Sequence, residues 1–322
     1  MKRILGAMLA VAEMVTAGHA AAQSSYPEKP IRIVVGFPPG SPSDIVARLL
    51  GQKLTEAWGK PVLVENVAGA GGSIAVDRVA KAVPDGYTLV IAASSQIVVN
   101  PNLYKLPYDP VRDFAPISQL CVASSILVVG NTVPVKNLQE LVALAKARPG
   151  ELTFASGGSG TFAHLPGELL KSMAGIDISH VPYKSVVSAM PDVLAGRVTM
   201  MFGPIPVVLP AMREGKLRAL AVTSLRRSSA VPEFPTVDES GYRGFEASTW
   251  FGLLAPAGTP ATIVRELRIE TVNALAQVDL RAKFADIGFE IIGNSPDEFA
   301  AVIKSEIPKW AKLIKDSGIK PD

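Results

Sequence analysis

The stretch from Glu65 to Lys81, ENVAGAGGSIAVDRVAK, places a cluster of glycines between an apolar strand and a helix. The residues that lead into it, PVLVEN, predict a short strand, and those after Gly72 predict a helix. A glycine-rich turn at the start of a helix presents backbone N–H groups at the positive end of the helix dipole. The stretch therefore predicts a βα unit whose turn can bind an anion without a charged side chain.

The residues on both sides of this unit alternate between strand and helix patterns. Residues 31–37, 62–65 and 87–92 predict strands, and residues 43–58 predict a helix with one apolar face. This βαβαβ order is typical of a parallel sheet with right-handed crossovers. Residues 126–222 repeat the alternation, which predicts a second α/β unit.

The C-terminal part is rich in helix. Residues 248–254 predict a strand, and residues 263–276 and 297–317 predict long helices with little strand between them. Such a tail cannot build its own sheet, so we expect it to pack on the first unit. The chain then crosses between two lobes near residues 120–125 and 245–249. The predicted domains are residues 26–123 with 246–322, and residues 124–245.

Two crossovers predict a hinge with a cleft between the lobes, because ligands of open α/β sheets bind beyond the carboxyl ends of the strands. Four small-residue loops follow predicted strand ends: residues 36–44, 68–73, 92–96 and 155–161. We expect them to face the cleft.

Composition excludes several classes. The 322 residues include 32 basic and 29 acidic ones, scattered along the chain, so no basic stripe for nucleic acid is present.

Residues 1–22 combine a basic start, a short apolar run and small residues at Ala20–Ala22, which predicts a secretory signal rather than a membrane anchor. Cys121 is the single cysteine and lies in an apolar run, which predicts a buried, inert thiol.

Motifs for nucleotides, metals and hydrolysis are incomplete. Ile74 stands where GxGxxG requires its third glycine, and no GxxxxGK[ST] occurs. The run GGSGT at 157–161 has threonine where a GxSxG elbow requires glycine. After the signal segment only His164 and His180 remain, too few for a metal site. His164 either donates a hydrogen bond into the cleft or bonds to nearby backbone, and both interpretations stay open.

The same loops, taken in order, resemble the solute receptors of tripartite tricarboxylate transporters, the Bug-type receptors. The resemblance covers residues 26–322. Its matching stretches are YPEKPIRIVVGFPPG, ENVAGAGG, DGYTLV, NPNLYKLPYDPVRDFAPIS, FASGGSGTFAHLPGELL, HVPYK, GKLRALAVTS, RSSAVPEFPTVDESG, WFGLLAPAGTP and IPKWAKLIKDSG.

The resemblance implies a two-lobed α/β periplasmic binding protein of the type II, Venus-flytrap kind, with no catalytic residues, metal or cofactor. It implies a small carboxylate or dicarboxylate ligand, membrane permease subunits as partners, a periplasmic location and, by default, a monomer. The ligand-binding positions that it implies are Phe37, Gly40, Ser41, Ser43, Ala70, Gly71, Gly72, Ser94, Gln96, Ser156, Gly160, Thr161, His164, Tyr183 and Gly203.

The sequence departs from the family pattern in three places. The family often has a glycine run with threonine before Asp44, where this chain has Ser41-Pro42-Ser43. It often has glycine where this chain has Ser185, and commonly aspartate where it has Gly203. The loss of a carboxylate at Gly203 predicts a ligand without an amine and more room at the distal end of the pocket. The alternatives to transport are a ligand-sensing receptor of the same fold, which would hand its closed state to a signalling partner, and an enzyme.

Overall fold

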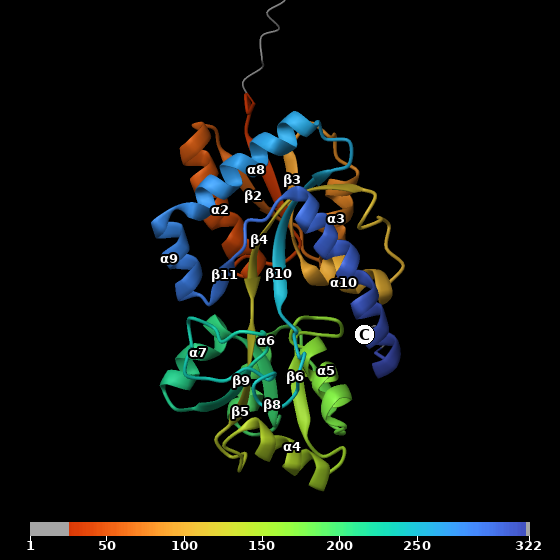
Figure 1. Cartoon of the computed structure of the whole chain (residues 1–322), viewed down its shortest axis with the longest axis vertical. Helices are drawn as coiled ribbons and strands as arrows, with labels where there is room; N and C mark the ends of the chain where they lie inside the picture. The colour runs from red at the N-terminus through yellow and green to blue at the C-terminus, as the bar shows by residue number, and fades with distance from the viewer. Residues whose placement is uncertain (1–25, 320–322) are drawn as a thin grey trace, which may run out of the picture.

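The computed structural model describes residues 26–319, so the predicted signal at residues 1–22 lies outside the described residues. Two lobes lie one above the other in Figure 1, and each is built on one sheet. The strand order is β11-β4-β10-β3-β1-β2 in the first sheet and β7-β6-β8-β5-β9 in the second. The predicted α/β architecture with two lobes is thus confirmed.

The first sheet contains β1 (Ile31–Val35), β2 (Val62–Asn66) and β3 (Thr88–Ala93), which run parallel as the βαβαβ pattern predicts. Strand β10 (Thr249–Pro256) lies antiparallel to β3, and β4 (Phe114–Ala123) lies antiparallel to β10. The C-terminal segment therefore completes the first sheet, as expected, but makes it a mixed sheet.

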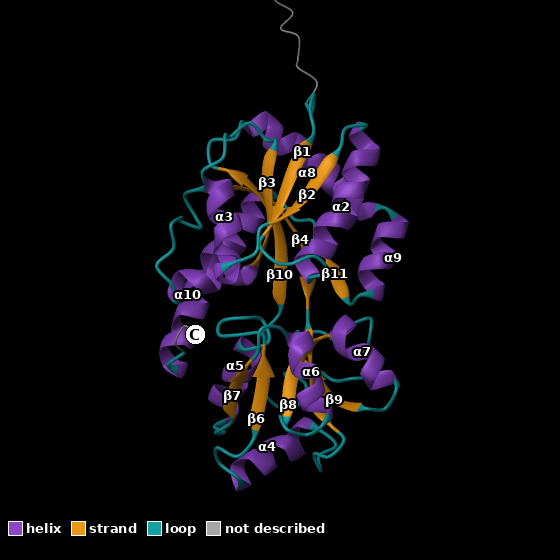
Figure 2. Cartoon of the chain, turned by 180° about the vertical axis from the view of Figure 1, so that it is seen from behind, coloured by secondary structure: helices purple, strands orange, loops and turns teal. Residues whose placement is uncertain are grey.

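Helices cover both faces of the first sheet (Figure 2). On one face the side chains of α2, α8 and α9 share one apolar core, and on the other face those of α3 and α10 share a second. The elements of this lobe not yet given are α2 (Pro42–Trp58), α3 (Ser73–Ala80), α8 (Ala261–Ala276), α9 (Val278–Asp286), β11 (Phe289–Ile291) and α10 (Pro296–Ser317).

The second lobe holds the alternating series. Its strands are β5 (Ser125–Gly130), β6 (Thr153–Ser156), β7 (Ser179–Pro182), β8 (Met200–Pro204) and β9 (Leu217–Val222). Its helices are α4 (Leu138–Ala147), α5 (Leu165–Ala174), α6 (Val186–Leu194) and α7 (Ile205–Arg213). Strand β5 lies antiparallel to both β8 and β9, so this sheet is mixed too.

The chain crosses between the sheets at two adjacent points. Ala123 pairs with Thr249 in the first sheet, and the backbone of Ala247 donates to Thr223 of the second lobe. The crossings therefore fall within the segments predicted from the sequence. Thr223 is fully buried, and its hydroxyl accepts from the Ser125 N–H at 2.9 Å. We propose that the domain boundaries follow these crossings.

Two further findings bear on the sequence predictions. Cys121 is fully buried in the core of the first lobe, which confirms the structural interpretation, and burial raises the pKa of its thiol. Among residues 26–319, no helix combines the length and the apolar character that spanning a membrane requires.

Candidate functional site

The loops after β1, β2 and β3 converge, because the carboxyl ends of neighbouring parallel strands lie at one edge of the sheet. Gln96, fully buried, holds them together. Its Oε1 accepts from the Ala93 N–H at 2.8 Å, and its Nε2 donates to the Gly72 carbonyl at 2.9 Å. A β carbon on Gly36 would lie 2.3 Å from Gln96 Nε2, so this close approach requires glycine. Gln96 therefore joins the loop after β3 to the loop after β2.

Asp44 organises the loop after β1. Its carboxylate is 2% exposed and accepts from the Gly40 N–H at 2.9 Å, from Arg48 at 3.0 Å and from Asn66 at 2.9 Å. Burial acts to raise the pKa of Asp44, but the bonds from Arg48, Gly40 and Asn66 hold it below its usual value. The charge of Asp44 is thus committed to the loop. Arg48 lies four residues after Asp44 on the same helix, whereas Asn66 lies 22 residues away.

The glycine cluster adopts a left-handed backbone that favours glycine. The φ angles are +48° at Ala70, +60° at Gly71 and +86° at Gly72, where helix α3 begins. Ala70 carries a side chain in this region, which costs about 1–2 kcal/mol. Such strain is concentrated at ligand clamps and active sites. Asn100 steadies the turn by donating to the Gly71 carbonyl at 3.4 Å.

The other first-lobe positions named from the resemblance differ in exposure. Ser41 caps α2, since its side chain accepts from the Asp44 N–H at 3.4 Å. Ser43 is 1% exposed, and Phe37 is half-buried against the core of the lobe. Ser94 is buried at the crossing, 3.2 Å from the hydroxyl of Thr249. Its hydroxyl therefore faces the hinge.

The loop after β6 carries the second-lobe candidates. Ser156 is fully buried, and its Oγ lies 2.6 Å from Nε2 of His180 and accepts from the Gly158 N–H at 3.0 Å. The Thr161 hydroxyl donates to the Gly158 carbonyl at 2.8 Å. The loop is therefore closed on itself by its own side chains. His180, on β7, supports the loop through this contact with Ser156.

His164 takes the backbone alternative of the two that the sequence left open. Its Nδ1 accepts from the Gly160 N–H at 3.0 Å, and its side chain is 4% exposed. The His164 ring stacks on the His180 ring, with their centroids 3.9 Å apart. The His164 ring also stacks on the ring of Phe154. His164 thus holds the loop in place.

The carboxyl end of β7 places Tyr183 and Lys184. The Tyr183 hydroxyl donates to Asp192 at 2.5 Å, and this bond raises the pKa of Tyr183. Asp192 in turn pairs with Arg197, so the ring is fixed by α6. Lys184 is exposed and lines an open hollow together with Pro182, Tyr183 and Ser188.

The extra room expected at Gly203 is not present. A β carbon on this buried residue would lie 2.3 Å from Cγ1 of Val208, so the Val208 side chain fills the space. The expectation of a larger distal pocket is therefore wrong. A change of residue type in a strand does not show which neighbour moves into the gap.

The loop after β6 of the second lobe contacts the first lobe. A β carbon on Gly160, whose φ is +73°, would lie 2.5 Å from Leu103 Cδ1 and 3.5 Å from Val99 Cγ1 of the first lobe. Beside the crossing, a narrow pocket is lined by residues of both lobes. These residues are Ser94, Ser95, Phe162, Leu165, Pro166, Ala247, Ser248, Thr249 and Trp310.

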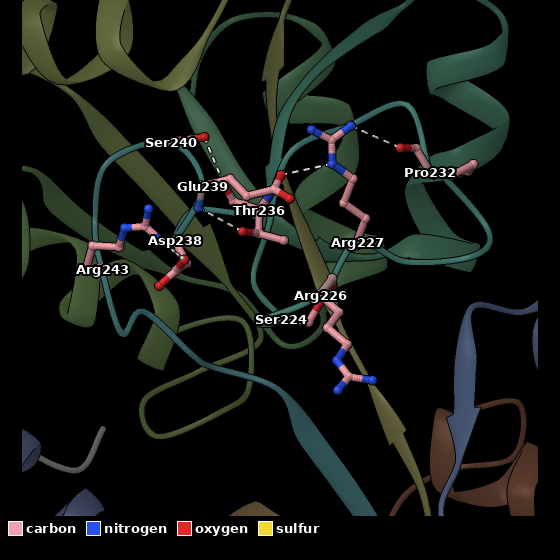
Figure 3. A network of polar contacts seen from close by, with 9 residues as sticks. All are labelled: Ser224, Arg226, Arg227, Pro232, Thr236, Asp238, Glu239, Ser240 and Arg243. Atoms are coloured by element: carbon pink, nitrogen blue, oxygen red, sulfur yellow. Dashed lines mark hydrogen bonds and ion pairs between the residues drawn. The ribbon is translucent and has the colours of Figure 1, made fainter.

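The segment that returns from β9 to the first lobe is held by a polar network (Figure 3). Glu239 accepts from Arg227 at 2.9 Å and from the Thr236 N–H at 3.0 Å. Asp238 accepts from the Gly244 N–H at 2.6 Å and pairs with Arg243. The network fixes the second crossing relative to β9. Trp250, just beyond it, is 2% exposed and donates to Glu306, so it is a core residue.

The arrangement is suited to binding. The turn at Gly160 of the second lobe meets Leu103 of the first lobe, and the buried charge of Asp44 is paired. Within residues 26–319, no group of three or more His, Cys, Asp or Glu side chains is placed to hold a metal ion.

Comparisons with known proteins agree with this geometry. The family model "Tripartite tricarboxylate transporter family receptor" matches residues 46–319. Protein BugT of Bordetella pertussis is 39% identical over 309 residues, which cover 95% of this chain and 95% of BugT.

Solved structures give the same result. R. palustris Rpa4515 with adipate has a TM-score of 0.84 and 34% identity, covering 92% of this chain and 100% of that one. MatC (Rpa3494) from Rhodopseudomonas palustris with bound malate has a TM-score of 0.79 and 33% identity, covering 90% of this chain and 100% of that one.

Proposed function

Because the chain belongs to the tripartite tricarboxylate transporter receptor family, we propose that it captures a small organic carboxylate between its lobes and delivers it to a membrane permease. Receptors of this family are periplasmic solute-binding proteins and not enzymes. The proposal extends that role to a ligand class and a partner, and it places this chain in the periplasm.

The observation that carries the proposal is the chemistry of the loops. A carboxylate is satisfied by convergent N–H donors, and the turns at residues 36–44, 69–72 and 157–161 are built from glycine and small polar residues. The N–H groups of Gly40, Gly158 and Gly160 are bonded within their own loops, so we assign the carboxylate to the turn at 69–72. The backbone conformation of the three turns is fixed by Asp44, Gln96 and His164. Preorganised donors bind an anion without the cost of ordering long charged side chains.

The two R. palustris relatives support a dicarboxylate, since one is described with adipate and the other with malate. Both acids carry two carboxylates on a short aliphatic chain. We propose a ligand of this size, held at one carboxylate by the turn at 69–72 and at the other end by the second lobe.

Closure follows from the two contact surfaces. Only the closed state lets both lobes touch one ligand, so binding shifts the equilibrium toward closure. Two-lobed periplasmic binding proteins close around their ligands by bending at a few residues between the lobes. In this chain the two crossings beside Thr223 supply such a hinge.

Thermal unfolding tests the proposal. Residues 23–322 are unfolded and refolded to remove any carried ligand, then heated with adipate, malate, citrate, aspartate, benzoate and glucose. An acid at about a hundred times its Kd raises the free energy of unfolding by about 2.7 kcal/mol, or several degrees. A shift with one acid class, and an unchanged acid in solution afterwards, is expected. The absence of any shift, or consumption of the acid, contradicts the proposal.

A further inference from the structure

We propose that His164 is a pH-sensitive positioning residue. Its unprotonated Nδ1 holds the loop 157–161 in the conformation that meets the first lobe, so acidification weakens closure and ligand binding. The ligand part of this inference rests on the proposed function. The position of the proton does not, and it is tested separately below.

The hydrogen bond fixes the tautomer. The Gly160 N–H is a donor and lies 3.0 Å from His164 Nδ1, so this nitrogen carries a lone pair and the ring proton sits on Nε2. Protonation would add a hydrogen to Nδ1 that faces the Gly160 N–H. The bond would be lost, and two donors would oppose each other in a buried site.

The bond matters because Gly160 is where the lobes meet. The α carbon of Gly160 packs so closely on Leu103 that a β carbon would lie 2.5 Å from Cδ1. The next residue, Thr161, continues into α5, whose first residue is Leu165. A loop released from His164 no longer presents this surface to the first lobe.

Two titratable groups contact the His164 ring, and a third pairs with one of them. Nε2 lies 3.6 Å from Oε1 of Glu168, which also pairs with Lys171 at 3.4 Å on the same helix. His180 stacks on the other side, from β7. Burial acts to raise the pKa of Glu168, but His164 and Lys171 hold it below its usual value, so the carboxylate is charged.

Glu168 lies next to Nε2, and His180 stacks on the face of the ring at 3.9 Å. The docked loop requires a lone pair on Nδ1 and therefore the neutral ring. Docking excludes the protonated ring, and by linkage a fall in pH opposes docking.

Substitution of His164 by asparagine or glutamine separates its role as a hydrogen-bond acceptor from its packing. The amide oxygen of Asn overlaps the position of Nδ1, whereas that of Gln reaches toward Nε2. His164→Asn therefore keeps an acceptor for the Gly160 N–H and cannot be protonated. His164→Gln removes this acceptor and serves as the matched comparison.

The experiment measures Kd for the acid with the largest thermal shift, from pH 8.0 to 5.0, in three proteins. Losing one backbone hydrogen bond when His164 is protonated predicts that the wild-type Kd rises about tenfold across this pH range. His164→Asn is expected to bind more tightly than His164→Gln at pH 7.5 and to change with pH only as the acid itself titrates. His164→Gln is expected to bind weakly throughout. Equal pH slopes in wild type and His164→Asn, or equal affinities of the two variants at pH 7.5, overturn the inference.

A ligand-free measurement keeps the test independent of the proposed function. Nitrogen-15 NMR of the imidazole rings reports which nitrogen carries the proton. At pH 7.5 the expected signal for His164 is the tautomer with its proton on Nε2. A proton on Nδ1, or a protonated ring at this pH, overturns the inference even if no acid tested binds.

Discussion

Gly160→Ala perturbs a point at which the second-lobe loop is packed tightly on the first lobe. Two costs follow from the structure. The φ of +73° strains any residue with a β carbon, and the new methyl group would lie 2.5 Å from Leu103 Cδ1. The first cost is about 1 kcal/mol and is present whether the lobes are open or closed.

The second cost exists only when the lobes are together. Overpacking costs about 1–3 kcal/mol, and because the Leu103 methyl group ends a flexible side chain we expect the lower half of this range. A penalty of about 1–2 kcal/mol in the closed state alone lowers ligand affinity about 5- to 30-fold. Isothermal titration calorimetry with the acid identified by thermal unfolding measures this loss.

Gly175→Ala is the matched control. Gly175 ends α5 with a φ of +60°, and a β carbon there meets nothing within 4 Å. This variant is expected to lose about 1 kcal/mol of stability and no affinity. In the double variant Gly160→Ala with Leu103→Ala, affinity should return to that of Leu103→Ala alone. Wild-type affinity in Gly160→Ala, or no recovery in the double variant, would refute the lobe contact as part of the bound state.

Three further variants test the supports of the site and the hinge. Asp44→Asn should lower the free energy of unfolding by about 2 kcal/mol at pH 7. Because the pKa of Asp44 is lowered in the folded chain, this deficit should shrink in urea titrations as the pH falls below about 4; a constant deficit contradicts the assignment. Burial raises the pKa of Glu306, which accepts from Trp250, so wild-type stability should decline as the pH rises above about 4.5, and Glu306→Gln should lack this decline. Thr223→Val leaves the buried Ser125 N–H without its side-chain acceptor and should cost about 1–3 kcal/mol, measured by urea unfolding at pH 7; an unchanged midpoint would exclude this anchor.

The parts of the fold that follow local periodicity are predictable from the sequence. Helix α2 begins within one residue of its predicted start, because Ser41 and Asp44 supply a cap and an acidic first turn. The strands β1, β2 and β3 are short apolar runs bounded by glycine or proline, and the sequence places them correctly. The C-terminal return to the first lobe follows from a tail with too few strands for a sheet.

Strand β4 is not predicted from the sequence, because its apolar and polar residues do not alternate. Its middle is buried on both faces, and it contains the polar residues Ser118 and Gln119. These are satisfied by Asn294, which accepts from the Gln119 N–H at 2.9 Å from 175 residues away. Helix α9 is not predicted from the sequence, because only the extended backbone of Gln277 separates it from α8. Local sequence encodes neither the pairing of β4 nor the break between α8 and α9.

The candidate site, like the fold, is only partly predictable from the sequence. Glycine turns are visible in sequence because few other residues adopt their backbone angles, and those at Gly71 and Gly72 occur where expected. The partner of a side chain is not visible. Tyr183 turns to Asp192, and Val208 fills the gap beside Gly203. Both depend on how α6 and α7 pack on the sheet.

Both lobes are proposed to bind one carboxylate ligand through their loop backbones. The decisive experiment is a crystal structure of residues 23–322 with the acid that gives the largest thermal shift. We expect one carboxylate within hydrogen-bond distance of backbone N–H groups in the turn at 69–72 and contact of the same molecule with the loop 157–161. An acid bound outside the space between the lobes, or held mainly by lysine and arginine side chains, would contradict it.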